Sequence, residues 1–102
     1  MDSINIYQFL NKKEILNSSI SIDDLTKLRN HLIQKLQNSN VVYIDLSNLR
    51  SLSPSFAYEV FGKLADKLEG LEDKLKYSND KRNLKTRILN ALSRRKNVLQ
   101  HS

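Results

Sequence analysis

One run of apolar residues constrains this chain more than any other feature. It is "VVYIDL", residues 41–46, which begins with β-branched and aromatic side chains. Such a run is typical of an interior strand that is covered on both faces of its sheet. Amphipathic helical patterns lie on either side of it, over 22–38 and 54–69. Because each helix must bury its apolar stripe against a neighbour, this order indicates an α/β fold.

Both helical patterns have recognisable starts. Ser21 is expected to cap the first helix, with Asp24 reaching back in a capping box. Ser53 is a suitable N-cap for the second helix, and Pro54 suits its first position, where the missing N–H costs nothing. Gly70 is expected to end that helix.

The remaining segments complete the order of elements. Residues 4–10 alternate in the manner of a strand, and 13–16 predict a short second strand. Lysines alternate with apolar residues over 74–78, which suits an edge strand, and a third helix is expected over 80–97. We therefore predict a small mixed sheet of about four strands, with the first strand antiparallel and the helices mainly on one side.

Length and composition limit the organisation and the location. The chain of 102 residues suits one domain, predicted over 1–97 with a frayed tail at 98–102. The absence of cysteine excludes disulfides and thiolate metal sites. The sequence contains neither a membrane-spanning run nor a signal peptide, so we expect a cytoplasmic protein. So small a core predicts help from a partner or from a second copy in a homodimer.

Positive charge is concentrated in the last third of the chain. Residues 74–102 hold nine lysines and arginines but only one acidic residue, whereas residues 1–73 hold eight lysines and arginines and ten acidic residues. The basic residues of helix 81–96 that could contact nucleic-acid phosphates are Lys81, Arg82, Lys85, Arg87, Arg94, Arg95 and Lys96. A solvated helix face is the simpler interpretation, and no aromatic residue follows Tyr77 to stack on bases. Nucleic-acid binding is therefore the alternative function.

The sequence offers little catalytic chemistry. His31 lies in the middle of a predicted helix, and His101 lies in the tail. Two histidines without cysteine make no metal set, and there is no glycine-rich phosphate loop. We expect neither an enzyme nor a cofactor.

The most distinctive site lies at the start of the second helix. If Pro54 is its first residue, Ser55 lies in the first turn, near unpaired N–H groups and the positive end of the helix dipole. A phosphate on Ser55 would be tolerated there and would add about −1.5 to −2 charges to a surface. The alternative is that Ser53 and Ser55 only satisfy helix N–H groups. Phe56 lies off the apolar stripe, and either fills a gap beneath the loop or anchors a partner.

The segment "VVYIDLSNLRSLSPSFAYEVFGKL", residues 41–64, resembles the central signature of the STAS domain, the sulfate-transporter and anti-sigma-factor-antagonist family. It is most similar to the small STAS-like branch. Asp45-Leu46-Ser47 matches the end of the family's strand, and Ser55 falls where antagonist-type members carry a phosphorylated serine. The family's acid and glycine near that serine are replaced here by Ser53 and Phe56.

The resemblance implies a regulatory module that binds another protein. Its partner would be an anti-sigma factor or an ATPase/kinase, or a host protein inhibited by a phage or mobile element. The implied site residues are Ser53, Ser55, Phe56, Asp45 and Ser47. From the residues themselves, Asp45 is expected to end a strand and to fix the following loop to Ser47 and Ser55.

Overall fold

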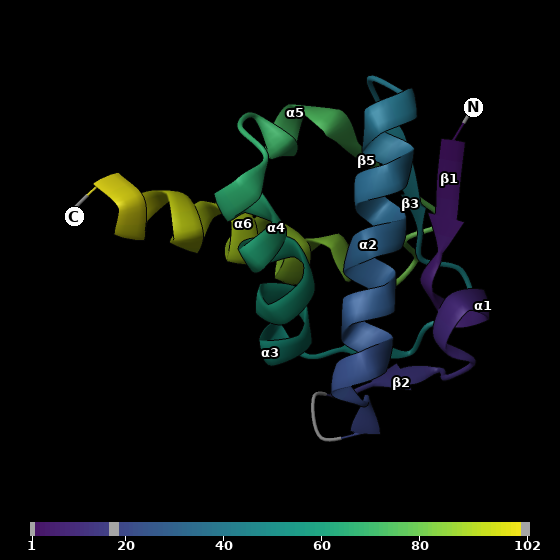
Figure 1. Cartoon of the computed structure of the whole chain (residues 1–102). Coiled ribbons are helices and arrows are strands. Elements are labelled where there is room, and N and C mark those ends of the chain that lie inside the picture. Colours follow the sequence, from purple (N-terminus) through teal and green to yellow (C-terminus); the bar gives the residue numbers. More distant parts are fainter. Residues whose placement is uncertain (1, 17–18, 101–102) are drawn as a thin grey trace.

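The computed structural model describes residues 2–16 and 19–100, and from residue 94 onward only the backbone (Figure 1). The strands are β1 (Asp2–Asn5), β2 (Glu14–Ile15), β3 (Val42–Asp45), β4 (Ser51–Leu52) and β5 (Leu75–Ser78). The helices are α1 (Ile6–Leu10), α2 (Ile22–Asn38), α3 (Pro54–Ala57), the π-helical turn η2 (Tyr58–Gly62), α4 (Lys63–Lys67), α5 (Leu71–Lys74) and α6 (Lys85–Gln100). The α/β class, the helix over 22–38 and the edge strand near 74–78 are confirmed.

The strands form two small sheets. β3 is the centre of a three-stranded sheet in the order β1-β3-β5, and β2 pairs with β4 in a separate two-stranded sheet. Every pairing is parallel, including Ile4 opposite Ile44 in β1 and β3. The predicted antiparallel first strand is therefore wrong. The chain between β1 and β3 contains α1, β2 and α2, a connection long enough to return it in the same direction.

The first predicted strand is also shorter than expected. Strand β1 ends at Asn5, and Ile6–Leu10, predicted as strand, forms α1. The reason is local, because the Asn5 side chain caps the helix by accepting a hydrogen bond from the Gln8 N–H at 2.8 Å. Ile6 and Leu10 are both buried, as their helical spacing of four residues permits. The short alternating pattern thus concealed a strand followed by a helical turn.

Only one face of the three-stranded sheet is covered. The side chains of Ile4, Val42, Ile44 and Leu75 are buried on the inner face. Tyr77 lies opposite Ile44 on the same face, and burial raises the pKa of its hydroxyl group to about 12. The outer face is polar, and its rows are Ser3, Tyr43, Lys76 and Asn5, Asp45, Ser78. These side chains are half-buried or exposed, so the prediction that strand 41–46 is covered on both faces is wrong.

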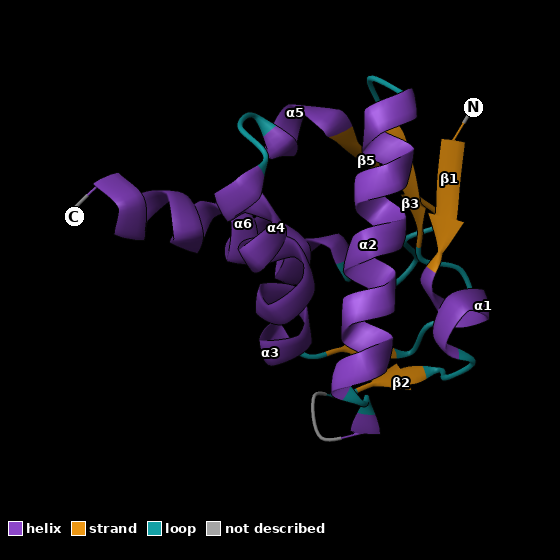
Figure 2. Ribbon diagram, in the orientation of Figure 1, coloured by secondary structure: helices purple, strands orange, loops and turns teal. Residues whose placement is uncertain are grey.

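Helices fill the inner side of the sheet. In Figure 1, α2 lies in front of the strands, and the helix formed by α3, η2 and α4 lies beside it against α6. Figure 2 shows the same division, with strands on one side and most of the helical mass on the other. The predicted apolar stripe of α6 is buried, with Ile88 fully enclosed. That of α2 is buried at Leu28 and Leu32, whereas Ile33 and Leu36 are only partly buried. The C-terminal part of α6 projects away from the rest of the molecule (Figure 1).

The second predicted helix runs from Pro54 to Lys67 and contains the π-helical turn η2. Arg29 of α2 donates a hydrogen bond from Nη1 to the Glu59 carbonyl in this turn at 2.6 Å. A π-turn interrupts the regular hydrogen-bond ladder of an α-helix, so an external donor there stabilises it. Gly70 does adopt the left-handed conformation expected of it, with φ at 71°, but it precedes α5 and lies beyond the helix end.

Helix α6 begins later and ends later than predicted. Residues 80–84 form a turn, and the Asp80 carboxylate accepts hydrogen bonds from the N–H groups of Leu84 at 2.6 Å and Lys85 at 3.0 Å. These bonds satisfy N–H groups at the helix start and place its first residue at Lys85. The backbone stays helical to Gln100, into the segment predicted to fray, and residues 101–102 lie outside the described part.

Candidate functional site

The serine corner, Ser53–Phe56, forms the start of the second helix as predicted. Ser53 is its N-cap, and its Oγ accepts a hydrogen bond from the Phe56 N–H at 3.1 Å. Pro54 occupies the first turn, and Ser55 follows it with an exposed side chain. The Ser55 hydroxyl has no hydrogen-bond partner among the described residues. Capping therefore falls to Ser53, and the Ser55 hydroxyl is presented to solvent.

Phe56 belongs to the core. Its exposed fraction is 0%, which excludes the side chain as a surface anchor and confirms that it fills the space beneath the loop. Ala57, Val60 and Phe61, which follow it along the helix, are equally buried. Phe56 therefore fixes the position of the serine corner from below, while Pro54 and Ser55 remain exposed above it.

Asp45 joins three loops at the carboxyl ends of the strands. Its Oδ1 accepts hydrogen bonds from the Ser47 N–H and from Asn79 Nδ2, both at 3.0 Å. Its Oδ2 accepts one from Asn5 Nδ2 at 3.1 Å, and Asn5 also donates to Ser47 Oγ at 2.8 Å. We call these four residues the Asp45 network. They come from the ends of β1, β3 and β5, so one carboxylate ties together the segments that leave the whole sheet.

Burial and hydrogen bonding act in opposite directions on the pKa of Asp45. Burial raises the pKa of its carboxyl group, whereas hydrogen bonds from Asn79, Ser47 and Asn5 lower it. The hydrogen bonds prevail, and the pKa lies below the ordinary value of 3.8. The network therefore holds an ionised carboxylate at neutral pH.

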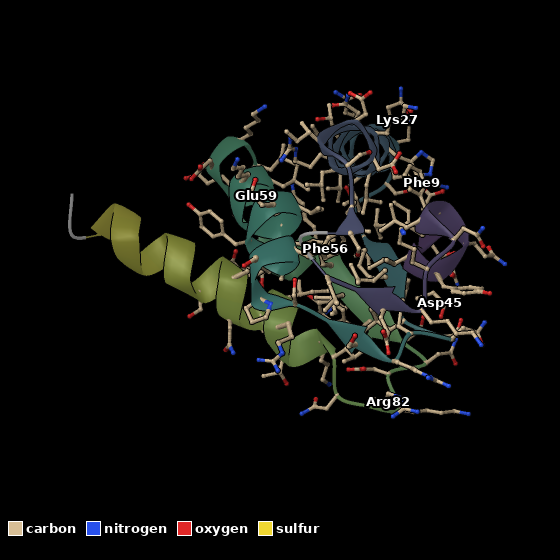
Figure 3. All side chains as sticks on the ribbon, turned by 90° about the horizontal axis from the view of Figure 1, so that it is seen from below. Phe9, Lys27, Asp45, Phe56, Glu59 and Arg82 are labelled. Atoms are coloured by element: carbon tan, nitrogen blue, oxygen red, sulfur yellow. The ribbon has the colours of Figure 1, made fainter. Side chains whose placement is uncertain are left out.

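The structure brings Asp45 and Ser47 together but does not connect them to Ser55. The expected contact between Asp45 and Ser47 is present, while the one expected with Ser55 is wrong. The chain leaves the network through Leu46–Arg50 and then forms β4 before it reaches Ser53. In Figure 3, Phe56 lies near the middle of the molecule, whereas Asp45 lies apart from it, towards the edge. The predicted site is thus two separate places.

The predicted basic helix is divided as well. Lys81 and Arg82 lie in the turn before α6, not on the helix. Lys85 and Arg87 are exposed in its first turns, and Arg87 lines a small hollow together with Pro54 of the serine corner. The side chains of Arg94, Arg95 and Lys96 lie outside the described residues.

Sequence reasoning missed the asparagines of the network. Asn5 was included in a predicted strand, and Asn79 follows β5 with a left-handed φ of 54°. Asparagine is enriched in that conformation, so an asparagine directly after a strand was the available signal. Their pairing with Asp45 depends on the parallel order of the three strands, which the sequence did not reveal.

Other candidate groups are placed as follows. The His31 ring stacks on Phe9 of α1, with ring centroids 5.4 Å apart. Within the described residues, no group of three or more histidine and acidic side chains could hold a metal ion. The same part of the chain contains no helix that is both long enough and apolar enough to cross a membrane.

Comparison with known families identifies the domain. The family described as "STAS-like domain of unknown function (DUF4325)" matches residues 26–85, more than half of the chain. The chain belongs to this family. Its matched segment runs from α2 to the first residue of α6 and includes the serine corner and Asp45. In this STAS-like domain, β1, α1 and β2 precede the matched segment, so Asn5 lies outside it. No match was found among curated proteins or among solved structures.

Proposed function

We propose that this STAS-like domain is a regulatory module that binds another protein through the serine corner, and that phosphorylation of Ser55 switches this binding. The observation that carries the proposal is the exposed Ser55 hydroxyl, which has no structural partner among the described residues. Ser53 provides the cap and Phe56 the buried anchor. The resemblance adds that antagonist-type relatives carry their phosphorylated serine at this position.

The switch would act through charge while the fold remains intact. A phosphate on Ser55 adds about −1.5 to −2 charges to a surface where a partner meets a hydroxyl. The first turn of the helix tolerates this charge because its N–H groups carry partial positive charge. Arg87 lines the hollow next to Pro54 and supplies a further cation nearby. Repulsion and desolvation would then weaken the interface without unfolding the corner.

The class of partner follows from the family resemblance. An ATPase/kinase or an anti-sigma factor is the partner of choice, and a host protein is the alternative if the domain belongs to a phage or mobile element. The module is proposed to work in the cytoplasm without catalysis or cofactor of its own. Asp45 and Ser47 hold the sheet ends and are not assigned to the partner surface.

Comparative capture tests the proposal. Tagged wild type, Ser55→Ala and Ser55→Asp are incubated with lysate of the source cell, and the captured proteins are identified and their affinities measured. Ser55→Ala should retain a partner that Ser55→Asp loses, with binding at least about tenfold weaker. Ser3→Asp adds the same charge at an exposed serine on the outer face of the sheet and is the matched control. Equal binding by all variants would refute a role for Ser55 in recognition.

A further inference from the structure

A hollow of about 460 Å³ lies at the carboxyl ends of β3 and β5, outside the serine corner. Leu46–Arg50 lines one side of it, Asn79–Arg82 the other, and Lys13 a third. The apolar side chains in its lining, Leu46, Leu49 and Leu84, are buried. Its volume falls within the range of about 300–1,000 Å³ typical of small-molecule pockets. In open parallel sheets, ligands bind at this end of the strands.

Positive charge converges on this hollow from three segments of the chain. Its cations are Lys13, Arg50, Lys81 and Arg82, and all four side chains are exposed. None of them forms an ion pair with a described residue. The single acid in the lining is Asp80, whose two carboxylate oxygens already accept hydrogen bonds from Leu84 and Lys85. The hollow therefore has an excess of cations whose charge the described residues leave uncompensated.

Backbone and side-chain hydrogen bonds hold the segments that carry these cations. The Arg50 N–H donates to the Lys13 carbonyl at 2.8 Å, which joins two of them directly. The Asp45 network fixes the starts of the other loops through Ser47 and Asn79. Asp80 fixes the turn that carries Lys81 and Arg82, and Figure 3 shows Arg82 on the same side of the molecule as Asp45. Because their backbones are already positioned, a ligand would have to order only the side chains.

Like charges held together repel one another, and an anion between them removes that cost. Lysine and arginine are the residues that bind phosphate, arginine through paired N–H groups and lysine as a point charge. The hollow has four cations and one carboxylate, which already accepts hydrogen bonds. Its excess of positive charge is larger than a single phosphate group neutralises. We propose that this basic hollow binds a small molecule that carries two or more phosphate groups. The inference is independent of the proposed function of Ser55, which does not line the hollow.

Pyrophosphate is the probe for this site. In a titration followed by backbone amide NMR signals, the largest shifts should fall in Ser47–Arg50 and Asn79–Leu84. The double variant Arg50→Gln/Arg82→Gln should bind at least about tenfold more weakly, because charge-assisted hydrogen bonds are lost. Both side chains are exposed, so the fold should persist, which circular dichroism checks. Sodium chloride at matched ionic strength is run in parallel.

Control variants separate this site from general charge. Lys27→Gln/Lys67→Gln removes the same charge from exposed positions on α2 and α4, and should leave pyrophosphate affinity unchanged. Ser55→Asp should also leave it unchanged. Equal losses in both double variants, or equal shifts with sodium chloride, would overturn the proposal. Duplex DNA that binds more tightly than pyrophosphate and shifts α6 signals would replace it with nucleic-acid binding.

Discussion

The serine corner and the Asp45 network are stabilised by different kinds of interaction, although one continuous stretch of chain connects them. The serine corner is held by apolar burial, since Phe56 is fully enclosed, and at its surface the Phe56 N–H donates a cap hydrogen bond to Ser53 Oγ. The Asp45 network is held by three hydrogen bonds to one carboxylate and by a fourth from Asn5 to Ser47 Oγ. The first arrangement leaves a hydroxyl free above a fixed support. In the Asp45 network the polar groups are already used to fix loops, so a ligand would have to bind to other residues.

The largest effect should come from the support of the serine corner. Phe56→Ala should lower the free energy of unfolding by about 3–5 kcal/mol, because a fully buried aromatic side chain is lost and a cavity remains. Urea unfolding measures this change. Leu64→Ala, at another buried position of the same helix, should cost about 2–5 kcal/mol. A loss below about 1 kcal/mol at Phe56 would show that apolar burial does not hold the corner.

A substitution in the Asp45 network should lower the free energy of unfolding by a smaller amount, and this amount should depend on pH. Asp45→Asn should cost about 1 kcal/mol at neutral pH, because its donors lose a charged acceptor at a partly exposed site. The folded-state pKa of Asp45 is lowered, so its contribution is present above the unfolded value near 3.8 and disappears as the pH falls through the folded value. Unfolding curves of both proteins, compared at neutral pH and at about pH 2, test this. A difference that grows on acidification would contradict the assignment.

The smallest effect should come from Ser55 itself. Ser55→Ala should change the free energy of unfolding by less than about 0.5 kcal/mol, since the exposed side chain has no described partner. Ser53→Ala is the matched comparison and should cost about 1 kcal/mol, because it removes the cap of the Phe56 N–H. Thermal unfolding of the two variants gives the order. If Ser55→Ala were the more damaging, Ser55 would be a structural residue.

The sequence predicted well where one local signal was sufficient. Ser53 and Pro54 marked the helix start, and the apolar run near Val42–Asp45 marked the central strand. The prediction failed where partners distant in sequence decide the outcome. Asn5 caps α1 and also reaches Asp45, which lies forty residues further along the chain. The open outer face of β3 depends equally on which side of the sheet the helices occupy.

The candidate site was only partly predictable for the same reason. The exposure of Ser55 followed from its place in the first turn of the helix, a local property. The basic hollow did not follow, because Lys13 and Arg50 are scattered in sequence and meet only through the pairing of β2 with β4. Lys81 and Arg82 were assigned to a helix that begins later, at Lys85.

The π-helical turn between the serine corner and α4 has a consequence for the evolution of this helix. Such a turn accommodates one residue more than an α-helical turn, so relatives without it should show a single-residue deletion within Tyr58–Gly62. That deletion would rotate the residues before it by about 100° relative to Leu64 and the rest of α4. Phe56 would then leave the core, or Ser55 would face a different direction. The additional residue of the π-helical turn therefore determines the direction of the exposed Ser55 side chain relative to α4.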